Sequence, residues 1–119
     1  MANVIMKTPG ISEKELFRMM QGKNEGLKKV VGDIFDVVEC AEIEKPDKDG
    51  ELIRVIFLVL EDGRTVGSNS ITVRNTFESM VEAFGLPSRE KPWTGVTVVS
   101  TENKSGSRTY LDLDFAEEN

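Results

Sequence analysis

The segment from residue 103 to residue 115, NKSGSRTYLDLDF, combines two opposed chemistries on one short stretch of chain. If residues 107–115 are extended, period-two alternation sends Thr109, Leu111, Leu113 and Phe115 to one face, which is typical of a core. The other face begins with Arg108 and Tyr110 and ends with Asp112 and Asp114. A guanidinium beside an aromatic ring is suited to stacking on nucleobases and to pairing with phosphates. The carboxylates would repel phosphate.

Other aromatic and basic side chains are candidates for the same chemistry. Trp93, the only tryptophan, follows Pro92 and is open to two interpretations, a second stacking platform or a lid on the core. Arg54 is the only charge in the apolar run 52–60, which predicts an outward position on a binding face, with Phe57 of opposite parity in the core. The remaining candidates, each of which could also be an ordinary surface residue, are Lys104, Lys28, Lys29, Arg64 and Asn69.

Several kinds of catalytic and metal site have no counterpart in the sequence. There is no histidine, which removes the commonest general base and metal ligand. There is no glycine-rich phosphate loop, HExxH, CxxC or EF-hand loop, and KPDKDGE (45–51) is interpreted as a turn. Cys40 lies in an apolar strand pattern and is expected to be a small buried hydrophobe. We therefore expect a protein that is not an enzyme and that uses no cofactor or metal.

The net charge of −6 is unevenly distributed along the chain. Residues 33–51 and 112–119 hold twelve of the 21 acidic residues, so the rest of the chain could still present a local positive groove. The acidic blocks could also simply keep the domain soluble.

Length and hydropathy favour one soluble domain. The 119 residues suffice for a core without metal or disulfide support, and no apolar run approaches the roughly 18 residues that span a membrane. The first ten residues are too polar for a secretory signal. We expect a cytoplasmic protein of a bacterial host cell, with no membrane partner.

The N-terminal region predicts a short helix. Ser12 is a suitable N-cap with Glu15 completing a capping box, Gly22 ends the helix, and Leu16, Phe17 and Met20 form its apolar stripe. Two interpretations remain open: a helix that plugs one end of a core, or a basic arm that helps to hold a polyanion.

The rest of the chain predicts strands and one longer helix. Residues 27–43 indicate one long strand in which Gly32 marks a bulge or bend. Residues 51–60 and 64–70 form a hairpin whose turn contains Asp62 and Gly63. Residues 70–85 switch to a helical period, capped by Ser70 or Thr72, with an apolar stripe that includes Phe77 and Phe84. Residues 95–101 and 107–115 form a second hairpin.

This order predicts a mainly β protein, a five-stranded Greek-key OB-fold with a helix between strands 3 and 4 and a short N-terminal helix. A ubiquitin-like β-grasp competes less well, because its helix follows two strands and here three precede it. We expect an N-terminal arm with the short helix over 1–26, the OB-fold domain over 27–115, and an acidic tail over 116–119.

A family resemblance adds to these patterns. LEDGRTVGSNS, a helix ending in AFG, the loop LPSREKPW and the closing hairpin STENKSGSRTYLDLDF resemble the small single-stranded DNA-binding proteins of protein-primed phages and related conjugative elements of Gram-positive bacteria. The resemblance covers residues 29–115. It implies an OB-fold that coats single strands during replication or transfer. The closing loop contains Lys104 and Arg108, but it has fewer basic residues than the family pattern leads us to expect.

Two functions are thus predicted. The first is sequence-independent binding of single-stranded DNA in phage or mobile-element replication or transfer, with Tyr110 as the best stacking residue. The acidic C-terminus could then recruit replication proteins, or serve solubility alone. The alternative is an acidic interaction module, a DNA mimic that binds a basic host protein through Asp33, Asp36, Glu39, Glu42 and Glu44. Monomer and dimer are both compatible with the sequence, because a long strand could leave an exposed edge.

Overall fold

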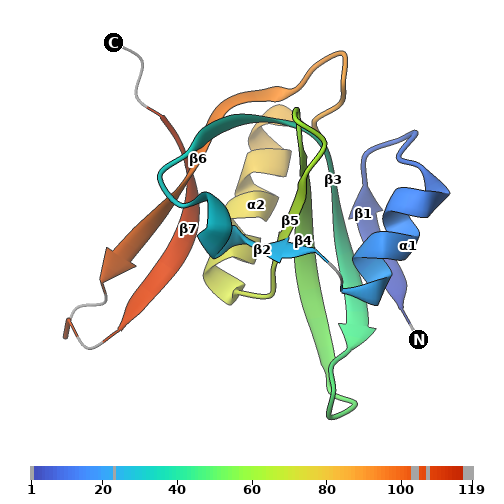
Figure 1. The fold of residues 1–119 in the computed structure, drawn as a ribbon, viewed down its shortest axis with the longest axis horizontal. Helices are drawn as coiled ribbons and strands as arrows, with labels where there is room; N and C mark the ends of the chain where they lie inside the picture. Colours follow the sequence, from blue (N-terminus) through green and yellow to red (C-terminus); the bar gives the residue numbers. More distant parts are fainter. Residues whose placement is uncertain (1, 23, 103–104, 107, 117–119) are drawn as a thin grey trace.

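One curled, half-barrel sheet of seven strands, accompanied by two helices, forms the described part of the chain, which comprises residues 2–22, 24–102, 105–106 and 108–116 (Figure 1). This computed structural model confirms the expectation of a mainly β protein with helices. The predicted count of five strands is wrong, because two short N-terminal strands join the sheet. The elements are β1 (Asn3–Lys7), α1 (Glu13–Gln21), β2 (Glu25–Gly26), the 3-10 turn η1 (Leu27–Val30), β3 (Ile34–Pro46), β4 (Leu52–Leu60), β5 (Thr65–Ser68), α2 (Ile71–Phe84), β6 (Trp93–Glu102) and β7 (Thr109–Phe115).

The strand β3 links the two halves of the sheet. The strand order is β2-β5-β4-β3-β6-β7, and β1 pairs separately with β3. The N-terminal end of β3 pairs antiparallel with β6, whereas the remainder pairs with β4 and β1. Register shifts at Val37 and Glu39 mark the place where β3 passes from one partner to the other. Such irregularities bend a strand and increase its twist, which is what a curled sheet requires.

The start of β3 differs from the prediction. Residues 27–30 form a 3-10 turn rather than strand, and the strand begins only at Ile34. Gly32 adopts φ of +85°, a left-handed conformation that interrupts an extended chain. Its N–H donates to the carbonyl of Val98 at 3.1 Å, so the bend is held against β6. The glycine was expected to mark a bend, but the bend ends the strand instead of lying within it.

Both faces of the β3–β4 pair are buried. On one face, α2 packs through Val73, Phe77 and Met80 into the larger core. On the other, α1 and the preceding loop bring Met19 and Ile11 onto a second cluster. This two-sided burial explains why every residue of β4 from Val55 to Leu60 is buried. The arrangement favours the interpretation of α1 as a core helix over that of a basic arm.

The helix caps follow the prediction, but two aromatic residues do not. Ser12 accepts a hydrogen bond from the N–H of Glu15 at 3.1 Å, and Ser70 accepts one from Val73 at 3.3 Å. Phe17 was expected in the apolar stripe of α1, yet it is 62% exposed, because the stripe centres on the fully buried Met19. Phe84, expected in the stripe of α2, is 57% exposed at the last turn of that helix. Neither helix of the described ranges is long and apolar enough to cross a membrane.

We predict that Gly32→Ala lowers the free energy of unfolding by about 1 to 2 kcal/mol, because alanine is strained at a left-handed φ. A Cβ at this position meets nothing within 4 Å, so the cost is one of backbone conformation alone. Gly26→Ala is the matched control, since Gly26 has φ of −78° and equally open surroundings. Urea unfolding measures both variants, and an equal effect of the two substitutions would contradict the assignment.

Candidate nucleic-acid interface

The β6–β7 hairpin carries the aromatic and basic pair singled out in the sequence. The two strands pair antiparallel from Val96 opposite Phe115 to Glu102 opposite Thr109. Leu113 is buried, and Leu111 and Phe115 pack against the larger core, as the alternation predicts. Tyr110 faces the other way and is 40% exposed. In Figure 1 the end of β6 and the start of β7 extend away from the rest of the sheet.

Arg108 lies immediately before β7 and is exposed. Within the described residues, no ion pair or hydrogen bond engages its guanidinium, which therefore remains available to an anion. Lys104, also predicted as a contact, lies outside the described residues. The hairpin thus presents one defined cation two residues from an exposed ring.

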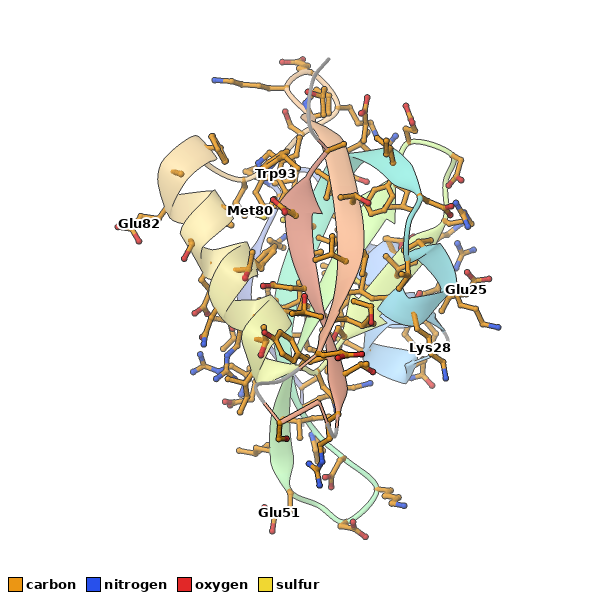
Figure 2. All side chains as sticks on the ribbon, turned by 90° about the vertical axis from the view of Figure 1, so that its left-hand side faces the viewer. Glu25, Lys28, Glu51, Met80, Glu82 and Trp93 are labelled. Atoms are coloured by element: carbon orange, nitrogen blue, oxygen red, sulfur yellow. The ribbon has the colours of Figure 1, made fainter. Side chains whose placement is uncertain are left out.

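Lys28 and Lys29 lie on η1, which packs beside the hairpin. The neighbouring side chains Leu27 and Val30 are buried, so the two lysines must point outward. The turn contacts β6, and Val31 bridges Val98 on that strand. Figure 2 shows Lys28 to one side of the hairpin, projecting into solvent. The fold therefore brings these two predicted residues to the flank of the strands that lead to Arg108 and Tyr110.

Arg54 and Arg64 are neutralised by local carboxylates instead. Arg54 lies between Glu42 and Glu44, with nitrogen–oxygen distances of 3.5 and 3.7 Å. It faces the α2 side of the sheet, not the hairpin, which corrects its predicted place on the binding face. The Nε of Arg64 donates to Asp62 at 2.8 Å within the β4–β5 turn. Both arginines have structural partners, and neither joins the hairpin.

Asn69 is exposed at the junction between β5 and α2. It borders a small groove with Lys45 and Phe57, between the end of α1 and the sheet. This groove lies on the face that α1 covers. Asn69 is therefore not gathered with Arg108 and Tyr110.

Trp93 is a lid on the core, not a stacking platform. The side chain is only 5% exposed, and its ring lies edge-on to Phe77 with centroids 5.9 Å apart. Its Nε1 donates to the carbonyl of Gly85 at 3.0 Å, which fixes the ring beneath the end of α2. Little of this ring is therefore accessible to a nucleobase. The position of Trp93 next to Pro92 is compatible with a stacking platform and with a lid on the core, and the burial of the side chain supports the lid.

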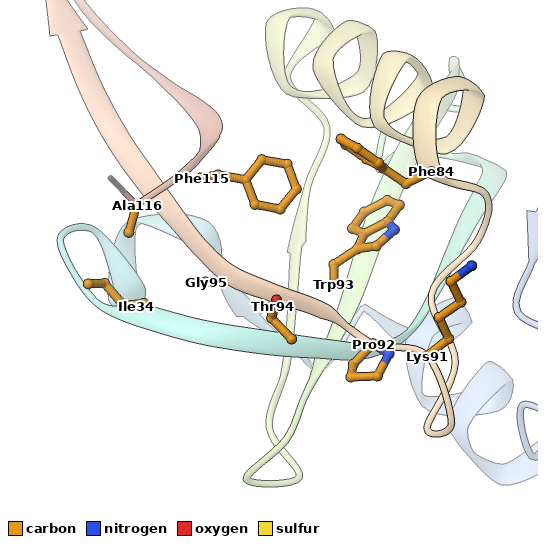
Figure 3. A pocket seen from close by; sticks show the side chains of 9 residues that line it. All are labelled: Ile34, Phe84, Lys91, Pro92, Trp93, Thr94, Gly95, Phe115 and Ala116. Atoms are coloured by element: carbon orange, nitrogen blue, oxygen red, sulfur yellow. The ribbon is translucent and has the colours of Figure 1, made fainter. Parts of the chain in front are cut away.

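An apolar pocket of about 790 Å³ lies beside this tryptophan and was not foreseen (Figure 3). The rings of Phe84 and Phe115 meet edge to face in it, with centroids 5.5 Å apart. Ile34, Thr94 and Lys91 complete much of its wall. The sequence gives no signal for the pocket, because Phe84 and Phe115 have the periodicity of core residues. These two residues are partly uncovered because they lie at the end of α2 and at the end of β7.

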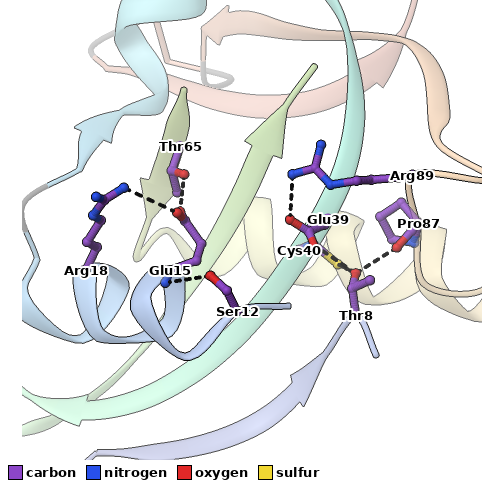
Figure 4. Close-up of polar contacts among 9 residues, drawn as sticks. All are labelled: Thr8, Ser12, Glu15, Arg18, Glu39, Cys40, Thr65, Pro87 and Arg89. Atoms are coloured by element: carbon purple, nitrogen blue, oxygen red, sulfur yellow. Dashed lines mark hydrogen bonds and ion pairs between the residues drawn. The ribbon is translucent and has the colours of Figure 1, made fainter. Parts of the chain in front are cut away.

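The acidic row proposed for a DNA mimic is not assembled as an exposed track. Glu39 pairs with Arg89 at 3.0 Å (Figure 4), and Asp36 accepts the N–H of Gly95 at 3.2 Å. Glu42 is fully buried, and Glu44 pairs with Arg54. The register shift between Val37 and Glu39 changes which side chains of β3 share a face. Of this row, Asp33 alone is exposed and has no hydrogen bond or ion pair at its carboxylate among the described residues.

Two buried titratable groups have strongly shifted pKa values. Burial raises the pKa of the Cys40 thiol to about 12, which makes it an unreactive core side chain, as predicted. Burial also raises the pKa of Glu42 to about 7, reinforced by the neighbouring carboxyl of Glu78 and opposed by Arg54 and Arg74. Neither oxygen of Glu42 has a hydrogen-bond partner among the residues that the structure describes. In the described ranges, no group of three histidine, cysteine or acidic side chains is placed to hold a metal ion.

We predict that Glu42 makes the fold less stable as the pH rises. The pKa of Glu42 is higher in the folded chain than its usual 4.5, so the unfolded chain loses this proton first. The free energy of unfolding should fall by about 2 to 3 kcal/mol between pH 4.5 and pH 7 through this group. Glu42→Gln should flatten that part of the profile and stabilise the protein above pH 7.

Urea unfolding at several pH values measures the effect. Glu44→Gln is the control, because Glu44 is half-buried and paired with the same arginine. The prediction is contradicted if the free energy of unfolding of Glu42→Gln falls with pH as steeply as that of the wild type. It is also contradicted if Glu44→Gln removes this pH dependence to the same extent.

Comparisons with family models, curated proteins and solved structures give no match for this chain.

Proposed function

We propose that this protein is a non-enzymatic, largely sequence-independent single-stranded DNA-binding protein of phage or mobile-element replication or transfer. The observation that carries the proposal is the outer end of the β6–β7 hairpin. There an exposed tyrosine ring lies two residues from an exposed guanidinium that has no ion pair among the described residues, and two outward lysines lie on the adjoining turn. Stacking on an aromatic ring contributes about 1 to 3 kcal/mol per base, and cations along the backbone path supply the salt-dependent part.

The strand order supports an OB-fold assignment. Without the short β1 and β2, the five remaining strands run β5-β4-β3-β6-β7. The bent strand β3 is shared between the two halves, and α2 follows the third of these five strands. This is the order expected of a five-stranded Greek-key barrel with a helix before its fourth strand. In such folds the hairpin of the last two strands flanks the ligand, which is the place of Arg108 and Tyr110.

Among the described residues, ion pairs engage four of the six arginines but not Arg108. Arg18, Arg54, Arg64 and Arg89 each lie within 4.0 Å of a carboxylate oxygen. Lys28, Lys29 and Arg108 have no ion pair among the described residues. The path of the nucleic acid is also limited, because Asp114 is exposed farther along the outer face of β7. We therefore propose that the strand crosses the hairpin near Tyr110 rather than following β7 toward Phe115.

The acidic interaction module is less well supported. Its carboxylates on β3 are engaged in internal contacts or buried, so they do not offer the regular spacing of phosphates. Residues 117–119 of the acidic tail lie outside the described residues. Recruitment of replication proteins through this tail stays a proposal that follows from the sequence alone.

We predict that Tyr110→Ala weakens binding of a labelled oligothymidine of roughly 30 nucleotides by about 5- to 150-fold, the equivalent of one lost stacked base. Fluorescence anisotropy at low and moderate salt measures the dissociation constant. Arg89→Ala is the control, since Arg89 is exposed but paired with Glu39. Circular dichroism verifies that each variant is folded.

We predict that replacing both Lys28 and Lys29 by glutamine reduces the salt dependence of binding. Each lost phosphate contact should lower the slope of log affinity against log salt by about 0.7. Absence of wild-type binding at low salt would sink the proposed function. If Arg89→Ala weakens binding as much as Tyr110→Ala and the double lysine variant do, this surface has no specific role in binding.

A further inference from the structure

The apolar pocket beside Trp93 gathers large apolar side chains that the fold leaves uncovered. Its volume of about 790 Å³ falls within the range of roughly 300 to 1,000 Å³ that is typical of small-molecule sites. Ile34 and Phe84, which form part of its wall, are 66% and 57% exposed. Exposed apolar side chains that gather at one place mark a site of interaction, whereas singly scattered ones do not.

The aromatic part of the wall is held in place by contacts within the protein. The rings of Phe84 and Phe115 meet edge to face with centroids 5.5 Å apart. The indole of Trp93 is fixed by its hydrogen bond to the carbonyl of Gly85 at 3.0 Å. Figure 3 shows the rings of Phe84 and Trp93 on one side of the pocket and Ile34 on the other. The pocket is therefore formed before a ligand arrives, as small-molecule sites usually are.

The charge of the wall indicates which kind of ligand fits. Lys91 is the only charged side chain among the nine residues that line the pocket, all of which belong to the described part of the chain. It is exposed and has no ion pair among the described residues. Aromatic rings would also suit a quaternary ammonium group, but no carboxylate of the wall balances a cation and Lys91 repels one. Charge complementarity therefore favours an anion.

We propose that this pocket binds a small amphipathic anion, a molecule with a hydrocarbon body and one carboxylate. The hydrocarbon body lies against Phe84, Phe115 and Ile34, and the carboxylate pairs with Nζ of Lys91 at the rim. None of these residues belongs to the surface proposed for nucleic acid. The binding of the anion therefore does not depend on the binding of single-stranded DNA.

The test compares three ligands that share one hydrocarbon chain and differ in charge: octanoate, octanol and octyltrimethylammonium. Trp93 is the only tryptophan of the chain and lines the pocket, so its fluorescence reports occupancy. Titration calorimetry at constant salt, below the concentrations at which the ligands form micelles, measures the dissociation constants. We expect octanoate to bind most tightly, although the net charge of −6 favours the cation at long range.

Two substitutions locate the site. Phe84→Ala should weaken octanoate binding by about 5- to 30-fold, because the ligand loses apolar contact with the ring. Lys91→Gln should weaken octanoate by about two- to fivefold and leave octanol unchanged, because only the ion pair is lost. Phe17→Ala and Lys14→Gln are the matched controls, since they change an exposed phenylalanine and an exposed lysine of α1 outside the pocket.

The wild-type comparison decides the proposal without any variant. The proposal is overturned if octanoate gives no saturable change in the fluorescence of Trp93, or if the three ligands bind equally well. It is also overturned if the control variants weaken octanoate as much as the pocket variants do. Should Phe84→Ala not fold, Ile34→Ala replaces it, because Ile34 is the more exposed residue of the wall. A wild-type dimer in sedimentation velocity whose Trp93 fluorescence ignores octanoate would assign the pocket to a second copy and overturn the proposal.

Discussion

The pairing of β3 with three neighbours is the constraint on which the structure depends. One strand of thirteen residues must serve β4 and β1 along most of its length and β6 at its start. The two register shifts near Val37 let the chain turn between these partners. Side chains from both faces of β3 and β4 enter the two hydrophobic clusters. The hairpin that carries Tyr110 joins the sheet through the pairing of β6 with the start of β3, and α2 packs against its other strand, β7.

Much of the architecture follows from local sequence. Capping residues, the helical stripe of α2 and the alternation of β7 are local patterns, and each predicts its element well. The errors occur where distant contacts decide. The bend at Gly32 is stabilised by Val98, the burial of Trp93 depends on Phe77 and Gly85, and the exposure of Phe17 depends on the side of α1 that faces β3 and β4. A register shift in β3 likewise buries Glu42, which no pattern in one strand reveals.

The residues of the proposed binding surface were predictable only in part, for the same reason. Arg108 and Tyr110 share a strand face, which alternation alone specifies. Whether a cation is free depends on its neighbours in space: Glu42 and Glu44 engage Arg54, and Glu39 engages Arg89. The net charge of −6 is therefore a poor guide to the local field. Many of the acids that produce it are occupied in ion pairs, a buried site or hydrogen bonds to the backbone.

The two chemistries of β7 are consequences of one position in the fold. The alternation of β7 turns one face to the core and leaves Tyr110 on the other, while α2 packs beside the strand. On the surface proposed for nucleic acid, acids on this outer face oppose binding least when they lie farther along the strand from Arg108 and Tyr110. Asp112 and Asp114 occupy that part of β7, where their carboxylates accept hydrogen bonds from the N–H groups of the residues that follow them.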